Sequence, residues 1–192
     1  MASTPAYTGQ NYAISNLRSS LGTLLRPNNF RVKLTLASTT GRADQPQIST
    51  IASTFEFRCE KAELPGRTIA TSDDMGSGPS LKLPYDTTYN DIRLSIICAS
   101  DMAERKFFEK WMDFIVKPGD VPQAGTVAFY SEYALGNKLE VSQLTDAGVP
   151  AIKYTCHHVY PIAITPMNAT WEEINTYQRF GVTLAYRYHT YA

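Results

Sequence analysis

The chain has 192 residues, of which 43% are hydrophobic and 19% charged, and its 18 basic and 18 acidic residues give a formal net charge of +0. This length and composition predict one globular domain spanning 1–192 and exclude a disordered or low-complexity chain. Because the charges balance, no global attraction for nucleic acid or an anionic membrane is expected, so any contact with DNA should be local or weak.

Alternation of apolar and polar residues is the strongest local pattern, and it predicts half-buried antiparallel strands after an extended N-terminal segment, 1–28. Four runs carry it, with one apolar face each: Phe30, Val32, Leu34 and Leu36; Phe55, Phe57 and Cys59; Ile92, Leu94 and Ile96; and Val182, Leu184, Tyr186 and Tyr188. Shorter strands are expected near 81–83, 126–130, 139–144 and 152–160.

Two long polar segments, 38–53 and 63–80, separate these runs and show no periodicity. Loops of that length are uncommon in a compact domain unless they have a function or a partner orders them. We therefore expect both to be loops with a role in contacts.

One segment has helical rather than strand periodicity. Large apolar residues recur at helical spacing within the segment 100–116, and four of them, Phe107, Phe108, Trp111 and Ile115, are expected to pack into the core. Glu104 and the basic residues around it would cover the polar side, Asp101 would cap the start with Glu104 in capping-box position, and Pro118 would follow the end. A second, short helical turn is expected near 168–175.

Roughly six to eight strands and one helix predict a mainly β fold, an antiparallel β-barrel or sandwich with one flanking amphipathic α-helix.

No residue pattern indicates catalysis, a cofactor or a metal. The stretch SDDMGSGPS lacks the lysine of a phosphate loop and the ligand spacing of a calcium loop, so a turn-rich loop is the better interpretation. His157 and His158 would point to opposite faces of a strand, and Glu172–Glu173 fits a helix start better than an acid–base pair. Three cysteines without CxxC spacing predict buried free thiols. We expect a protein that is not an enzyme and binds no cofactor.

The termini and the apolar runs bear on localisation. No basic and apolar leader pattern opens the chain, and nowhere do about 18 apolar residues follow one another as a spanning helix requires. The sequence therefore predicts synthesis as a soluble cytoplasmic protein without membrane anchoring.

The order of the segments resembles the tail tube proteins of contractile-tailed bacteriophages over nearly the whole chain. The resemblance rests on FRVKL, on CEKAELPGR (Cys59 to Arg67), on the strand entry Tyr89–Asp91, on the helix pattern DMxERxFFExW (Asp101 to Trp111) and on a final aromatic strand. It implies a β-barrel with a flanking helix that assembles into stacked six-fold rings, the inner tube of the virion tail.

The same resemblance implies partners and an interface. The partners would be other copies of the chain, the tail sheath, the tape measure, the baseplate and tail terminator proteins, and double-stranded DNA in transit to the bacterial host. The two long segments and the N-terminal segment would carry the contacts between rings, with these candidate interface residues in the long segments: Arg42, Asp44, Leu64, Pro65, Arg67, Asp73 and Asp74.

Four other functions stay open at this point. A baseplate tube initiator and the inner tube of a bacterial contractile injection system would have the same fold. A single-stranded nucleic-acid-binding barrel would use the Tyr- and Arg-rich C-terminal run, but it needs a basic groove that the net charge disfavours. A small-molecule carrier would need one closed cavity in a monomer.

Overall fold

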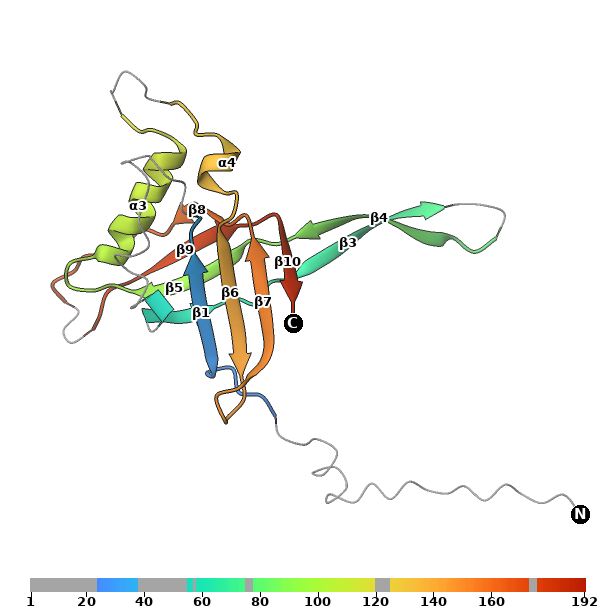
Figure 1. The fold of residues 1–192 in the computed structure, drawn as a ribbon, viewed down its shortest axis with the longest axis horizontal. Helices are drawn as coiled ribbons and strands as arrows, with labels where there is room; N and C mark the ends of the chain where they lie inside the picture. Colours follow the sequence, from blue (N-terminus) through green and yellow to red (C-terminus); the bar gives the residue numbers. More distant parts are fainter. Residues whose placement is uncertain (1–23, 38–54, 57, 75–77, 120–124, 173–175) are drawn as a thin grey trace, which may run out of the picture.

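The computed structural model describes residues 24–37, 55–56, 58–74, 78–119, 125–172 and 176–192. Two four-stranded antiparallel sheets form the body (Figure 1). Sheet A has the order β1 (Phe30–Thr35), β6 (Lys138–Leu144), β7 (Pro150–His157), β10 (Tyr188–Tyr191). Sheet B has the order β2 (Cys59–Ala62), β5 (Ile92–Ile97), β9 (Arg179–Ala185), β8 (Tyr160–Ile164).

The two sheets share one core, and their strands run across one another (Figure 1). Sheet A contributes alternate residues such as Val32 and Leu139, and sheet B contributes Ile92, Leu94 and Val182. The expected antiparallel β fold is confirmed in its sandwich form, since the sheets do not close into a barrel in the described part of the chain. Alternation predicted these strands because each sheet buries one face and leaves the other polar.

Two expected strands turned out to be pairs of strands joined by corners. The run 152–160 splits into β7 and β8 at His158, whose backbone is left-handed with φ 60. The C-terminal run splits into β9 and β10, so that Val182 and Leu184 belong to sheet B while Tyr188 belongs to sheet A. Burial does not keep its alternation across the corners: Cys156 is buried before the first corner and Val159 after it, and Tyr186 is buried before the second corner whereas Tyr188 after it is exposed.

Two further strand predictions were wrong. Residues 55, 56 and 58 are helical and the strand begins only at Cys59, although Phe55 is buried as expected; Phe57 lies outside the described residues. Near 126–130 there is one isolated bridge, between Val127 and Val116, and then the short helix α4 (Tyr130–Tyr133). The short turn expected at 168–175 is not helical over 168–172, and its remaining residues lie outside the described part.

The predicted amphipathic helix is α3 (Ala103–Ile115). Phe107, Phe108 and Trp111 are buried, Ile115 is half-buried, and Phe114, which the sequence analysis left out, is buried as well. Phe108 stacks on Trp111 at 6.2 Å between ring centroids and meets Phe180 of β9 edge to face at the same distance. The helix thus covers the sandwich through aromatic contacts.

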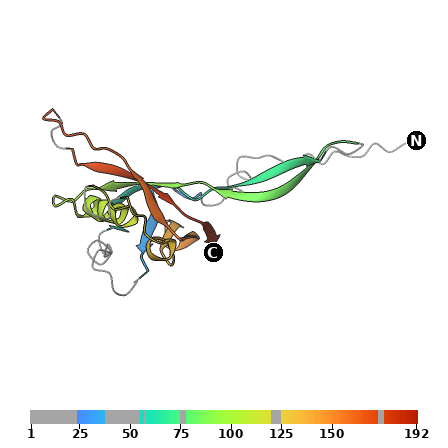
Figure 2. The same ribbon diagram turned by 90° about the horizontal axis from the view of Figure 1, so that it is seen from above.

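The segment 63–80, expected as a polar loop, contains the strand β3. β3 (Arg67–Asp74) and β4 (Leu81–Tyr89) form a two-stranded hairpin that extends far from the body (Figures 1 and 2). The strand expected near 81–83 is confirmed as the start of β4, but alternation could not predict the rest of the hairpin, because neither of its faces is buried. Its residues are instead rich in β-branched Thr and Ile, which favour extended backbone without marking a core face.

Candidate assembly surfaces

The projecting hairpin carries exposed apolar side chains on both of its strands. Ile69 of β3 is 55% exposed, and Leu81, Leu83 and Tyr85 of β4 are 61%, 45% and 72% exposed. Leu81 and Leu83 share one face because they are two residues apart. A two-stranded hairpin is marginally stable by itself in water, so these side chains are placed to pack against another molecule.

A bulge lies midway along the hairpin. Ala70 pairs with Asp86 and the next residue, Thr71, pairs with Pro84, so Tyr85 has no opposite residue on β3. Such a bulge increases the local twist and redirects a side chain. Pro84 also removes one backbone donor.

The predicted interface residues fall at two separate places. Leu64 and Pro65 lie in the turn before β3 and Arg67 begins the strand, whereas Asp73 and Asp74 end it, about 20 Å further along an extended chain. Asp73 lies opposite Lys82 in the register. Arg42 and Asp44, with the segment 38–53, lie outside the described residues. The fold therefore brings Leu64, Pro65 and Arg67 to the root of the hairpin and the two aspartates to its far end.

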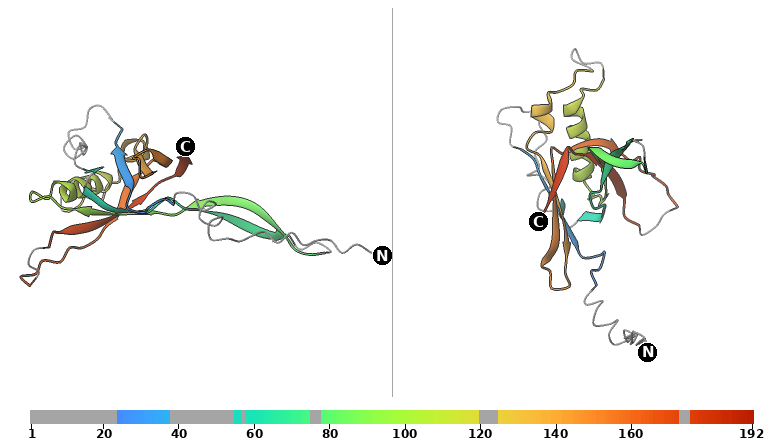
Figure 3. Two further views of the ribbon diagram at one scale, coloured as in Figure 1. Left: turned by 90° about the horizontal axis from the view of Figure 1, so that it is seen from below. Right: turned by 90° about the vertical axis from the view of Figure 1, so that its right-hand side faces the viewer.

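Aromatic contacts fix the root of the hairpin to the body. The Tyr186 hydroxyl donates a hydrogen bond to the Gly66 carbonyl at 3.2 Å, and the Tyr186 ring lies 5.9 Å from that of Tyr89 at the end of β4. Burial raises the pKa of Tyr186 to about 12, so this phenol keeps the proton that it donates. β4 continues into β5 almost in line, which directs the hairpin away from the body (Figures 2 and 3).

A second exposed aromatic residue lies at the other end of the molecule. The segment between β8 and β9 extends from the end of the body opposite the hairpin (Figures 2 and 3), and its Trp171 is fully exposed. The short helical turn expected near 168–175 gave no indication that Trp171 would be fully exposed.

The edges of the two sheets differ in regularity. In sheet B both outer strands are irregular: β2 has four residues and a register shift after Cys59, and β8 contains Pro161 and a shift beside it. Such features blunt an edge against pairing. In sheet A both outer strands, β1 and β10, keep a continuous register with their inner neighbours. Sheet A thus presents two regular edges.

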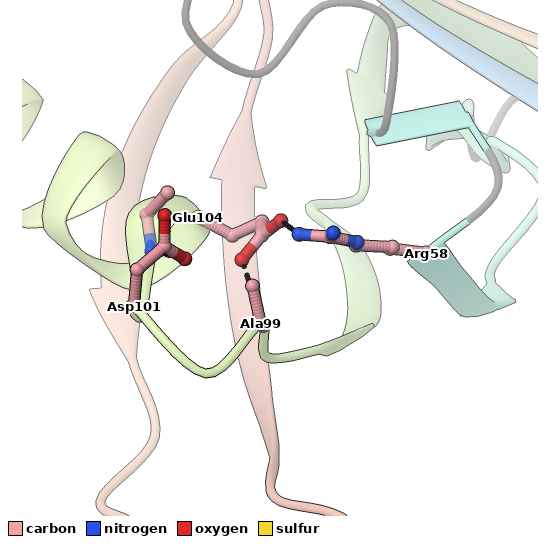
Figure 4. Close-up of polar contacts among 5 residues, drawn as sticks. Arg58, Ala99, Asp101 and Glu104 are labelled. Carbon is pink, nitrogen blue, oxygen red and sulfur yellow. Dashed lines mark hydrogen bonds and ion pairs between the residues drawn. The ribbon is translucent and has the colours of Figure 1, made fainter.

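A buried ion pair anchors the start of α3 (Figure 4). The Glu104 side chain has no solvent exposure; its Oε1 accepts from Arg58 Nη1 and its Oε2 accepts from the Ala99 backbone N–H at 3.1 Å. The expected capping box is therefore wrong, because Glu104 faces the body, although Asp101 Oδ1 does accept from the Ala103 N–H at 3.2 Å. A signal was available: Glu104 is four and seven residues before Phe108 and Trp111, on the apolar side.

The described residues hold no arrangement typical of catalysis or metal binding. No group of three or more His, Cys, Asp or Glu side chains is placed there to hold a metal ion. Burial raises the pKa of the Cys59 and Cys156 thiols to about 12, which makes them poor nucleophiles. All three cysteines are free, but Cys98, expected to be buried, is only half-buried. None of the described helices has both the length and the apolar character needed to cross a membrane.

Regular sheet edges and a projecting apolar hairpin are the features of a structural β protein rather than an enzyme. A profile of the phage tail tube protein family matches residues 25–192. The chain belongs to that family.

Solved structures share the fold at low sequence identity. A chain in the 6-fold symmetrised cryo-EM structure of the anti-feeding prophage (AFP) baseplate matches with a TM-score of 0.62 and 13% identity, over 89% of this chain and 97% of that chain. A chain in the extended sheath–tube complex of the extracellular contractile injection system PVC matches with 0.57 and 12%, over 94% and 97%. A chain in the AFP tube-terminating cap matches with 0.58 and 15%, over 97% and 98%. No curated protein sequence matches.

Proposed function

We propose that this chain, as one domain over 1–192, is the subunit of the inner tube of a contractile phage tail, and that it assembles as stacked hexameric rings. The family match supports the tube, and the likeness to chains of a 6-fold symmetrised baseplate and a sheath–tube complex supports the ring and its surroundings. The observation that carries the proposal is the pair of regular edges of sheet A.

The strand directions of sheet A suit ring closure. Each of its three pairings is antiparallel, so β1 and β10 run in opposite directions. If β10 of one subunit pairs with β1 of the next, the junction is antiparallel like the rest of the sheet. Four strands from each of six copies would then make one continuous sheet of 24 strands. A closed ring of this kind leaves no open edge in that sheet.

The polar face of sheet A would line the channel, because its other face packs on sheet B. Four basic side chains lie on this polar face, Arg31, Lys33, Lys138 and Lys153, together with the acidic Glu140. Arg31 pairs with Glu56 at 2.5 Å and Lys153 pairs with Glu140 at 3.0 Å. These pairs lower the attraction for phosphate, which suits a conduit through which DNA must pass rather than bind.

The hairpin would contact neighbouring subunits, including those of the next ring. Leu64, Pro65 and Arg67 at its root and Asp73 and Asp74 at its far end are the proposed contacts, with Arg42 and Asp44 from the segment 38–53. The proposed partners beyond other copies are the sheath, tape measure, baseplate and terminator proteins. The protein would be assembled in the bacterial cytoplasm and would be located in the virion tail. There the tube would serve as the conduit for genome delivery.

Two related functions are the second candidates. Because the matched chains come from AFP and PVC particles, the inner tube of a bacterial contractile injection system has the same structural support. A baseplate tube initiator would have this fold as well. Copy number in purified particles separates a tube subunit, which is present in many rings, from an initiator, which is present in one.

Negative-stain electron microscopy of the purified protein over a concentration series tests the proposal. We expect hollow rings and tubes with six-fold end views that become longer as the concentration rises. Uniformly small particles under every condition would refute assembly and favour a binding barrel.

Charge reversal at the far end of the hairpin is expected to impair stacking more than folding. Asp73→Lys with Asp74→Lys changes two exposed side chains, so the subunit should lose less than about 0.5 kcal/mol of folding free energy. If these carboxylates contact the next ring, tubes become shorter or fall apart into rings. Lys82→Gln, opposite Asp73, is the control for loss of the cross-strand pair alone. Tubes of normal length from the double variant would disprove this contact.

A further inference from the structure

All three histidines of the chain gather on one edge of sheet A. His189 lies on β10 itself, and His157, in β7, lies opposite Tyr188 of β10 and stacks on its ring at 4.7 Å between centroids. His158 follows at the corner, with its ring 5.9 Å from that of Tyr188.

The groups that face these imidazoles are neutral or cationic. His157 has Lys138 opposite it in β6, His158 beside it, and the Thr190 hydroxyl at 3.3 Å from its Nε2. The nearest carboxylate on the same face of β6, Glu140, is held by Lys153 at 3.0 Å.

His189 lies among three phenol rings, those of Tyr89, Tyr154 and Tyr186, at 5.2 to 6.0 Å. Arg67 at the hairpin root is the charge that acts on it, and Asp91 acts on the hydroxyls of Tyr186 and Tyr160 rather than on the imidazole.

His158 is held in a strained and incomplete position. Its backbone is left-handed, its N–H donates to the Asn137 carbonyl at 2.9 Å, and its ring stacks on Tyr130 at 5.9 Å. Its Nδ1 is buried and has no hydrogen-bond partner among the described residues. Arg187, whose charge acts on Tyr130, adds a further cation to this corner.

We propose that these histidines make the joining of subunits through β10 sensitive to pH, so that acidification below about pH 6 favours free subunits over tubes. This inference rests on the proposed function, because it concerns the edge through which the ring would close. When a neighbour covers β10, the imidazoles at this edge lose more water, so the assembled state would bind protons less readily than the free subunit. Assembly then releases protons, and acid opposes it.

The sign follows from the same contacts. Burial, then Lys138 and His158, lowers the pKa of His157 below its ordinary value of 6.5, and burial, then Arg67, lowers that of His189. If covering β10 lowers these pKa values further, the stability of the junction is complete above the pKa of the free subunit and decreases as the pH falls towards the value in the tube.

The test measures the critical subunit concentration for tube formation, by sedimentation and electron microscopy, at about pH 7.5 and about pH 5.5, a window in which ordinary carboxylates stay ionised. For the unmodified chain we expect a rise of about tenfold or more on acidification, with uptake of protons on disassembly. The variant with His157→Gln, His158→Asn and His189→Gln should change less than about twofold. Asparagine is chosen at 158 because it tolerates left-handed backbone.

Each outcome decides a different question. Tubes whose critical concentration is the same at both pH values would overturn the inference and leave the proposed function intact. A triple variant that keeps the full pH response would do the same. Absence of tubes at every pH would overturn the proposed function and the inference with it. Circular dichroism of the unassembled subunit at both pH values is the control that the subunit stays folded. If the triple variant does not fold, proton uptake on disassembly of the unmodified tube tests the inference instead, and absence of that uptake would refute it.

Discussion

Tyr191→Pro is expected to prevent ring closure while the subunit stays folded. Ala192 and Lys153 exchange both of their backbone hydrogen bonds between β10 and β7, so by the alternation of an antiparallel pair the Tyr191 N–H points away from β7, towards the open edge. Proline at this position removes a donor to the neighbouring subunit and places its ring in the junction, without breaking a bond to β7.

The expected effect is a rise of at least about tenfold in the critical concentration for tubes, since the lost bond and the steric conflict together exceed about 1.4 kcal/mol at each junction. Sedimentation at about pH 7.5, with electron microscopy of the pellet, measures it. Tyr191→Val is the matched control, because it removes the same ring and keeps both the donor and the strand preference. If the proline variant forms tubes as readily as the valine variant, β10 is not the closing edge.

Glu104→Ala should give the largest loss of subunit stability. The carboxylate is fully buried and accepts from Arg58 and from the Ala99 N–H, so its removal leaves the Arg58 guanidinium and the Ala99 N–H without this acceptor (Figure 4). Breaking a buried pair from one side costs about 3–5 kcal/mol, and the lower end applies because the Arg58 side chain is 34% exposed and can regain water. Urea denaturation of the unassembled subunit measures the change.

Asp113→Asn provides the comparison for that measurement. Asp113 is another carboxylate of α3, but it is exposed, so we expect a change within about 0.5 kcal/mol. Glu104→Gln should fall between the two, because the amide oxygen can still accept from Ala99 while the charge that Arg58 meets is gone. Equal stability of the Ala and Asn variants would show that the buried pair contributes nothing.

The part of the fold that the sequence predicted is the part in which burial imposes a pattern. Val32 and Leu34, or Ile92 and Leu94, alternate with polar residues because one face of each strand meets the core and the other does not. Alternation does not predict a strand correctly where the strand lacks one buried and one exposed face. The hairpin has no buried face, so Thr68 to Thr71 have the sequence pattern of a loop. At the two corners, the strand before the corner and the strand after it belong to different sheets, which one continuous pattern does not reveal.

The interface was accessible from sequence only in outline. Family resemblance directed attention to the segment 63–80, which contains only the first strand of the projecting hairpin. It gave no means to see that Leu81, Leu83 and Tyr85 are the large exposed apolar side chains of the second strand. The edges of sheet A depend on which strands pair, a property of contacts far apart in the chain. Glu104 was misplaced for another reason: charge was taken to mean exposure, whereas Arg58, 46 residues earlier, makes its burial possible.

Sheet A has an even number of strands, and in a ring closed through its two edges this parity limits how the subunit can change. A single added or deleted strand would make the outer strands of one subunit point the same way, and every junction would become a parallel one with slanted hydrogen bonds in an otherwise antiparallel wall. Strands can therefore enter or leave this sheet only two at a time, as whole hairpins. A tube built this way can widen by adding subunits or hairpins, but not by the single strand that most easily arises from lengthening one end of the chain.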